Sequence, residues 1–183
     1  MNVLLTSSGL DSQSVKDAFF SMLNKHISEV KALFILTAAI EVDAIRVLPK
    51  CLDDLTECGI KEENITVYDL HYPIDAELTD LFDVVYICGG NTEYLLRRMN
   101  EKMFSWKLLK YIRNGGVVVG VSAGAVVFAK NLEENLGLLP CILKVHTEEH
   151  TSNGIYKFFE CYTVSLSNGQ AIIPDEESFE VIG

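Results

Sequence analysis

The sequence predicts an α/β fold in three layers, with a mostly parallel sheet between helices on both faces. Short apolar runs alternate along the chain with segments whose apolar residues recur at helical spacing, and this alternation is typical of βαβ units. Several runs, such as residues 32–38 and 117–121, show no polar alternation, as is usual for parallel strands buried on both sides. Residues 161–182 break into short β-like pieces between turn signals, which predicts a small antiparallel part near the C-terminus.

Each strand is predicted from an apolar run that turn-forming or charged residues interrupt. The strands expected in the parallel part cover residues 2–7, 32–38, 65–70, 83–88 and 117–121. Those expected in the antiparallel part cover residues 161–166, 171–174 and 179–182. The fourth strand runs straight into a Gly-Gly pair and the fifth into Ser-Ala-Gly-Ala, so we expect a tight turn after each of them.

The helices are predicted from apolar stripes. The first follows Asp11 or Ser12, either of which could cap it, because short polar side chains accept hydrogen bonds from the first free N–H groups of a helix. The second covers residues 42–58 and is stopped by Gly59. The remaining helices are expected at residues 76–82, 92–99, 104–113 and 125–129.

The composition fits one soluble domain spanning residues 1–183, without a linker or an internal repeat. Hydrophobic residues make up 49% of the chain, which excludes a disordered polymer too poor in apolar surface to fold. With 15 Lys and Arg against 26 Asp and Glu, the net charge is −11. Neither nucleic acid nor an anionic membrane surface would attract such a chain, so we expect neither as a partner.

The cysteines and the N-terminus predict a cytoplasmic protein. The five cysteines form no CxxC pair, and we interpret them as small buried side chains in a reducing compartment. The first residues carry no basic leader and look like a strand. The longest apolar run, residues 117–129, is too short to span a bilayer.

The segment Gly120-Val121-Ser122-Ala123-Gly124 fits G-x-S-x-G, the nucleophile elbow. In such an elbow a strand ends abruptly, a helix begins at once, and the serine oxygen is exposed at the bend. Small neighbours let the chain turn and let a substrate approach. The Ala123 N–H at the start of the helix would then face a developing oxyanion. The alternative is a Gly-rich turn that merely packs tightly.

A second glycine turn, Gly89-Gly90-Asn91-Thr92, follows the fourth strand. Ligands of open α/β sheets bind outside the carboxyl ends of the strands, so both glycine turns would face one cleft. Backbone N–H groups of Gly89 or Gly90 could complete an oxyanion hole, and we count Asn91 with this binding group. Equally, Asn91 or Thr92 would cap the next helix.

A serine nucleophile needs a base, and His146 is the candidate. It follows Ser122 in the chain, as the histidine does in elbow-type enzymes. His26, His71 and His150 are interpreted as surface or loop residues, which is also the alternative for His146 itself. A carboxylate should orient the base. The sequence offers several without choosing among them: Glu133, Glu134, Glu148, Glu149 and Glu160.

Five stretches together resemble one known family. They are residues 4–9 (LLTSSG), 86–92 (YICGGNT), 120–125 (GVSAGA), 136–140 (LGLLP) with the histidine that follows, and 166–172 (LSNGQAI). These are similar to the N-terminal strand and turn, the G-G-G-N-T turn, the G-x-S-A-G-[AS] elbow, the L-G-L segment and the D-G-Q-A-[IL] tail of the peptidase E family. That family comprises serine peptidases, the alpha-aspartyl dipeptidases, and its relatives include cyanophycinase.

The resemblance implies a fold related to class I glutamine amidotransferase domains. It implies Ser122 as nucleophile, His146 as base, and an oxyanion hole made by Gly89 or Gly90 with Ala123. The implied reaction is hydrolysis of a short peptide after an N-terminal aspartate, through an acyl-enzyme and without a metal or a cofactor. The expected partner is therefore a small peptide substrate, and a homodimer is left open.

Three departures from the family pattern stand out. Cys88 replaces the first glycine of the turn, and the interval between nucleophile and base is shorter than in the family. Asn131 falls where some relatives carry Asp, so we expect Glu133 or Glu134 to act as the acid. No cation is assigned to the substrate aspartate, although Lys144 and Arg97 are candidates.

Two other functions remain open from the sequence. The first is a non-catalytic or degenerate binding domain that keeps the elbow for structural reasons, which the shortened interval favours. The second is an esterase or amidase that uses the same serine and histidine on another acyl compound.

Overall fold

The computed structural model describes residues 1–72, 74, 77–160 and 162–183. The expected helix start at Ala76 and strand start at Cys161 lie outside the described residues. The described strands are β1 (Val3–Thr6), β2 (Ala32–Ile35), β3 (Ile65–Tyr68), β4 (Val84–Ile87), β5 (Val117–Val121), β6 (Ile142–Lys144), β7 (Gly154–Lys157), β8 (Thr163–Ser165), β9 (Ala171–Pro174) and β10 (Ser178–Ile182). The described α-helices are α1 (Gln13–Met22), α2 (Val42–Glu57), α3 (Leu78–Leu81), α4 (Thr92–Glu101), α5 (Phe104–Arg113) and α6 (Ala123–Val126).

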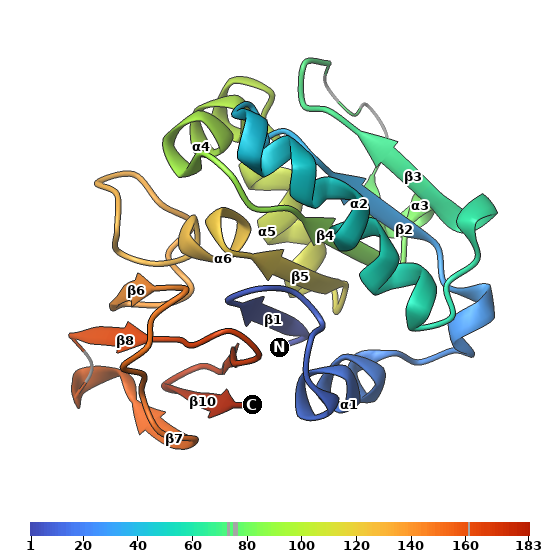
Figure 1. Cartoon of the computed structure of the whole chain (residues 1–183). Helices are drawn as coiled ribbons and strands as arrows, with labels where there is room; N and C mark the ends of the chain where they lie inside the picture. Colours follow the sequence, from blue (N-terminus) through green and yellow to red (C-terminus); the bar gives the residue numbers. More distant parts are fainter. Residues whose placement is uncertain (73, 75–76, 161) are drawn as a thin grey trace.

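The main sheet has the strand order β3-β2-β4-β5-β1-β9-β10-β7. The first five of these strands are parallel, and β9, β10 and β7 continue the sheet with antiparallel pairing. The register pairs Thr6 with Val121 and Ile87 with Gly120. Strands β1, β4 and β5 therefore end at the same edge of the sheet, and the turns that follow them meet there (Figure 1).

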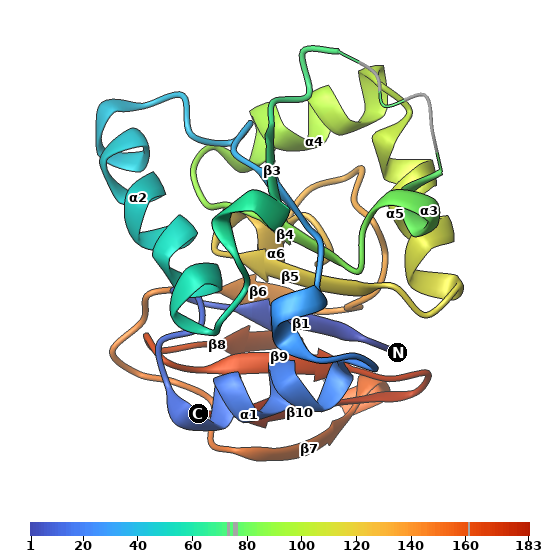
Figure 2. The ribbon, with the colours of Figure 1, turned by 90° about the vertical axis from the view of Figure 1, so that its right-hand side faces the viewer.

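The sheet is the middle layer of three, as predicted. Helices α1 and α2 cover one face and α4 and α5 cover the other (Figures 1 and 2). Alternate residues of β1 show the two faces, because Leu4 packs in the cluster with α1 and α2, whereas Leu5 packs in the cluster with α4 and α5. Strands β1, β2, β4 and β5 are buried along their whole length, which explains their apolar runs, whereas β3 at the edge of the sheet is partly exposed.

The C-terminal part confirms the predicted antiparallel piece and corrects one strand in it. β9 and β10 form a hairpin on β1. The strand expected at residues 161–166 is instead β8, which pairs in parallel with β6 in a separate two-stranded sheet. Neither β6 nor β7 was predicted, because each has only three or four residues and part of its surface is exposed.

The helix after the serine is shorter than predicted. Instead of reaching residue 129, α6 ends at Val126. The chain then turns so that Ala129 pairs with Leu139, and the Lys130 N–H donates to the Cys141 carbonyl at 2.9 Å. Those tertiary hydrogen bonds replace the intrahelical ones. The first helix does start as expected, since the Ser12 hydroxyl accepts from the Val15 N–H at 3.4 Å.

The structure describes four of the five cysteines. Cys51, Cys58 and Cys88 are buried free thiols, as expected. Cys141 is buried but disulfide-bonded, contrary to the expectation of a free thiol, and the expectation for Cys161 falls outside the described residues.

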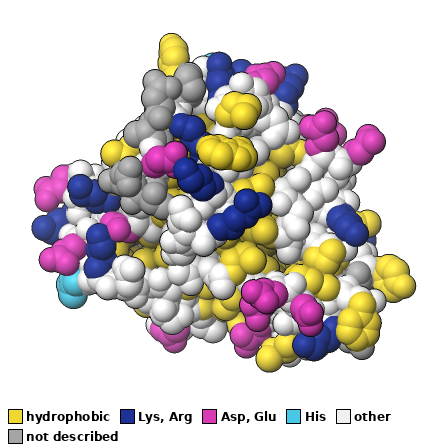
Figure 3. Space-filling view, turned by 180° about the vertical axis from the view of Figure 1, so that it is seen from behind, with side chains coloured by type: hydrophobic (Ala, Val, Ile, Leu, Met, Phe, Trp, Pro, Cys, Tyr) yellow, Lys and Arg dark blue, Asp and Glu magenta, His cyan; other side chains and the backbone are white. Residues whose placement is uncertain are grey.

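On the face seen in Figure 3, basic and acidic side chains are interspersed, with apolar side chains between them. Among the described residues no helix is both long and apolar enough to cross a membrane.

Candidate active site

Ser122 occupies a sharp bend between β5 and α6. Its backbone has φ 51° and ψ −111°, a conformation that costs energy for any residue with a side chain and often marks a functional site. Its N–H is held by the Thr6 carbonyl at 3.0 Å. A Cβ at Gly120 would collide with the Gly124 carbonyl, and a Cβ at Gly124 with the Ile87 carbonyl. Both glycines of the motif are thus required by close backbone approach.

His146 comes from the loop after β6 and faces Ser122. Its Nε2 lies 3.1 Å from Ser122 Oγ, which is within the range for proton transfer between a base and a nucleophile. Its backbone is also in the left-handed region, with φ 57°. The His146 N–H donates to Ser7 Oγ at 2.8 Å, and that hydroxyl is buried at the end of β1. The predicted pair of nucleophile and base is therefore brought together.

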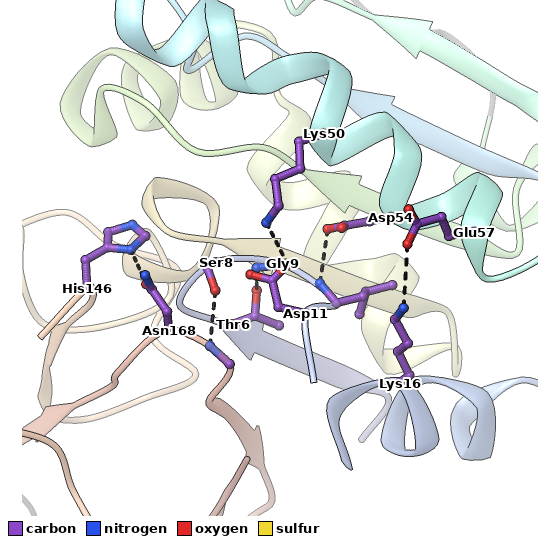
Figure 4. Close-up of polar contacts among 12 residues, drawn as sticks. Thr6, Ser8, Gly9, Asp11, Lys16, Lys50, Asp54, Glu57, His146 and Asn168 are labelled. Atoms are coloured by element: carbon purple, nitrogen blue, oxygen red, sulfur yellow. Dashed lines mark hydrogen bonds and ion pairs between the residues drawn. The ribbon is translucent and has the colours of Figure 1, made fainter. Parts of the chain in front are cut away.

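The other ring nitrogen of His146 contacts an amide, not a carboxylate. His146 Nδ1 lies 2.8 Å from Asn168 Oδ1 (Figure 4). Sequence reasoning missed this residue because it lies in the turn before β9, remote from the elbow in the chain. Its place in the tail that resembles D-G-Q-A-[IL] was the signal that could have found it.

The predicted acids are placed elsewhere. Glu134 Oε2 accepts a hydrogen bond from Asn100 Nδ2 at 3.2 Å, on the side of α4. Glu133 is exposed, and the ring nitrogens of His146 contact Asn168 and Ser122 instead. The reason is the early end of α6, which directs residues 130–135 away from the bend. The expectation that Glu133 or Glu134 orients His146 is thus not met by the described residues.

The remaining histidines lie apart from the serine. His26 caps the short 3-10 helix Ile27–Glu29, His71 Nδ1 lies 2.7 Å from Asp69 Oδ2, and His150 Nδ1 lies 3.2 Å from the Glu148 carbonyl. These placements agree with the interpretation of all three as surface or loop residues.

A cavity of about 320 Å³ opens beside Ser122. This volume is at the small end of ligand pockets and suits a compact molecule. The strand ends contribute Ser7, Ser8, Cys88, Gly89, Gly90, Val121, Ser122 and His146; helix α2 contributes Asp43, Ala44, Val47, Leu48, Lys50 and Cys51. The wall formed by α2 is largely apolar. Cys88 lies directly after β4, and burial raises the pKa of its thiol, so this thiol stays neutral.

The second glycine turn borders the cavity through Gly89 and Gly90, as predicted, but not through Asn91. A Cβ on Gly89 would lie 3.1 Å from the Ser122 Cβ, and a Cβ on Gly90 would collide with the Ala38 carbonyl. Both residues line the cavity. Asn91, which we had counted with the binding group, instead caps α4 by accepting from the Tyr94 N–H at 2.9 Å, and it is not among the cavity-lining residues.

Among the described residues that line the cavity, Lys50 carries a positive charge, and the sequence did not indicate its role. Its Nζ lies 2.6 Å from Asp11 Oδ1 (Figure 4). The hydrogen bond to Asp11 raises the pKa of Lys50. For Asp11, burial acts to raise the pKa, but hydrogen bonds from Lys50 and Ser8 outweigh it and lower the pKa. Lys144 and Arg97, the cations considered from the sequence, are not among the residues that line this cavity.

Asp54 supports the loop that carries Ser7 and Ser8. Its Oδ2 accepts from the Leu10 N–H at 3.0 Å and from the Tyr86 hydroxyl at 2.7 Å. Asp54 is 6% exposed, and burial raises its pKa despite these two hydrogen bonds. The carboxyl group thus ties α2 and β4 to the loop after β1.

The chain matches known peptidases in sequence and in structure. An uncharacterized peptidase of Pasteurella multocida (strain Pm70) is 33% identical over 61 residues, which are 32% of this chain and 30% of that relative's length. A crystal structure of a candidate peptidase E protein from Listeria monocytogenes EGD-e has a TM-score of 0.76 at 22% identity, over 100% of this chain and 98% of that one. A peptidase from an acI-B1 Actinobacterium has a TM-score of 0.63 at 16% identity, over 99% and 86%.

At these identities the two solved structures show the shared fold, which is the α/β fold predicted from the sequence. The family itself is shown by a sequence model, described as peptidase family S51, that matches residues 3–182. The resemblance to peptidase E inferred from the five motifs is therefore confirmed. Because the match covers nearly the whole chain, this protein belongs to peptidase family S51.

Proposed function

We propose that this protein is a serine peptidase that hydrolyses short peptides through an acyl-enzyme on Ser122. The observation that supports this most is the 3.1 Å separation of Ser122 Oγ and His146 Nε2 at a strained strand-to-helix bend. In the first step Ser122 Oγ attacks the peptide carbonyl and its proton passes to His146. His146 then protonates the departing amine, and a water molecule cleaves the acyl-enzyme by the same route.

Backbone N–H groups at the two turns would stabilise the oxyanion. The Ala123 N–H is the first of α6, and the first N–H groups of a helix lack an intrahelical partner. The Gly89 backbone lies next to the Ser122 side chain across the cavity. Each such donor contributes about 10²- to 10³-fold in rate when it is aimed at the developing charge.

The cavity supports a small substrate, and Lys50 supports an acidic one. The volume of about 320 Å³ suits a dipeptide better than a long chain. An N-terminal aspartate, which the resemblance to peptidase E implies, would place its carboxylate near the Lys50 ammonium. That ammonium has three donors, and among the described residues Asp11 accepts a hydrogen bond from one of them. The short interval between Ser122 and His146 in the sequence favoured the alternative of a non-catalytic binding domain. The contact between their side chains supports hydrolysis instead.

A panel of dipeptides tests the proposal. The purified protein is incubated with Asp-Leu, Glu-Leu, Ala-Leu and Leu-Leu, and release of free leucine is followed, with Ser122→Ala as the matched control. We expect release from Asp-Leu by the parent protein and none by Ser122→Ala. Equal release from all four peptides would refute the aspartate preference, and release that persists in Ser122→Ala would refute the nucleophile.

A further inference from the structure

We propose that Asn168 is the positioning residue of this site, a neutral amide that fixes which ring nitrogen of His146 carries the proton. The inference rests on the proposed function and assigns the group that orients the base. A carboxylate would have been expected in that place, yet the contact at 2.8 Å is made by the amide oxygen of Asn168.

The chemistry of the amide oxygen decides the tautomer. An amide oxygen only accepts hydrogen bonds, so His146 Nδ1 must carry the proton that lies between the ring and Asn168 Oδ1. The lone pair is then left on Nε2, which is 3.1 Å from Ser122 Oγ and ready to accept the serine proton. The other tautomer would place a proton on Nε2 and remove its ability to act as a base.

Hydrogen bonds on Gly169 hold Asn168 where it can do this. The Gly169 N–H donates to Ser8 Oγ at 3.1 Å, and the Gly169 carbonyl accepts from Ser12 Oγ at 2.7 Å. Gly169 has φ +83°, a conformation that glycine adopts without strain. The residue after Asn168 is therefore fixed between the loop after β1 and the cap of α1.

Gln170 fixes the same turn from its other side. Its Oε1 accepts from the Ser167 N–H at 3.0 Å, and its Nε2 donates to the Thr151 carbonyl at 3.1 Å. Gln170 is 4% exposed, so these bonds are shielded from competing water. This shielding matters because His146 and Asn168 are themselves exposed. The contact between their side chains therefore depends on a rigid turn rather than on burial.

A neutral amide orients the ring but provides no charge for the imidazolium that forms when His146 takes the serine proton. Among the described residues, the ring nitrogens of His146 contact Asn168 and Ser122, and neither partner is a carboxylate. Asn168→Asp should preserve the acceptor and add a charge. Because the pair is exposed, and exposed ion pairs contribute little, the added charge should speed attack by Ser122 by no more than about fivefold.

Two readouts on the full-length protein test the assignment. The first is ¹⁵N NMR of histidine-labelled protein at mildly alkaline pH, which reports the tautomer of His146. The second is the rate at which a fluorophosphonate probe labels Ser122. The variants are Asn168→Ala and Asn168→Asp, with Asn114→Ala as a control at an exposed asparagine at the end of α5. Thermal unfolding shows that each variant is folded.

We expect the parent protein and Asn114→Ala to show the Nδ1–H tautomer and equal labelling. Asn168→Ala should give a mixture of tautomers and label about 10²-fold more slowly or worse, since the wrong histidine tautomer in a serine triad costs about 10⁴. Asn168→Asp should keep the tautomer and label at least as fast as the parent.

An Asn168→Ala variant that keeps both the tautomer and the labelling rate would overturn the positioning role while leaving the proposed function intact. An Asn168→Asp variant that labels as slowly as we expect for Asn168→Ala would also overturn the positioning role. If Asn168→Ala does not fold, the labelling rate of Asn168→Asp alone decides whether Asn168 has this role. A folded parent protein that is never labelled would instead refute the proposed function, and the tautomer would still test Asn168.

Discussion

The hydroxyl of Ser7 accepts a hydrogen bond from the backbone N–H of His146 at 2.8 Å, across 139 residues of sequence. Ser7 directly follows β1, the neighbour of β5 in the sheet, so the end of the strand beside the nucleophile also holds the loop of the base. The Ser7 hydroxyl itself lies 3.5 Å from the Leu166 carbonyl. One buried side chain thus connects the end of β1, the His146 loop and the segment that leads to Asn168.

Ser7→Ala should therefore weaken the site more than the fold. Loss of one hydrogen bond costs about 1 kcal/mol of unfolding free energy, but His146 also loses the contact that supports its left-handed backbone. We expect fluorophosphonate labelling of Ser122 to slow about tenfold, the effect of roughly 1.4 kcal/mol. Ser21→Ala, an exposed serine on α1, is the control. Equal labelling of Ser7→Ala and Ser21→Ala would contradict this role.

The two glycine turns should respond differently to a methyl group. At Gly120 an added Cβ collides with the rigid backbone of Gly124, so Gly120→Ala should lower the unfolding temperature strongly or prevent folding. At Gly89 the added Cβ would lie 3.1 Å from the Ser122 Cβ and 3.5 Å from its Oγ. Gly89→Ala should remain folded but lose labelling. Comparable unfolding temperatures for the two variants would be inconsistent with this explanation.

Asp54 should give the protein a distinctive pH dependence. Burial raises its pKa in the folded state, so the folded protein holds the proton more tightly than the unfolded chain does. Its contribution to stability is complete below the ordinary aspartate pKa, about 3.9, and falls as pH rises through the raised native value. Asp54→Asn keeps one acceptor oxygen for Leu10 and Tyr86 and cannot ionise.

This linkage is tested by urea unfolding of the parent protein and of Asp54→Asn. The free energy of unfolding is measured from below the ordinary aspartate pKa to above the raised native value. Asp54→Asn should gain stability relative to the parent as pH rises, because the parent must then hold a buried charge. A difference that does not change with pH would exclude the linkage. Asp54→Ala should lose about 1–3 kcal/mol for each of the two donors left without a partner.

Lys50 should set any preference for an acidic substrate. Lys50→Met should reduce turnover of Asp-Leu about tenfold relative to Ala-Leu, the effect of losing a charged hydrogen bond of roughly 1.5 kcal/mol. Asp11→Asn should have the opposite effect, because it frees the Lys50 ammonium. Lys61→Met, an exposed lysine paired with Glu63, is the control. A ratio that is unchanged in both Lys50→Met and Asp11→Asn would place acidic recognition elsewhere.

The parallel part of the fold could be predicted from the sequence because burial on both faces leaves a visible pattern. Val117–Val121 and Ala32–Ile35 are buried along their whole length, and short apolar runs of this kind are typical of central parallel strands. Strand β7 leaves no such pattern, since it is an edge strand and Ile155 is 73% exposed. The early end of α6 depends on pairing with residues 139–141, which no local pattern reveals.

The site could be predicted only where it is local. Ser122 and its glycines form one contiguous motif, and the order of serine and histidine pointed to His146. Asn168 depends on a contact between two loops 22 residues apart, and such contacts carry no periodicity. Glutamates near the elbow in sequence were therefore favoured over an amide that the tail motif alone could have suggested.

Covalent labelling of Ser122 tests the central claim most directly. The protein is treated with a fluorophosphonate probe, digested, and the modified peptide is located by mass spectrometry, with Ser122→Ala and His146→Ala treated in parallel. The account predicts one adduct on Ser122, none in Ser122→Ala, and labelling slowed by about 10² or more in His146→Ala. A folded protein that is not labelled, or one labelled at Ser122 equally well without His146, would contradict it.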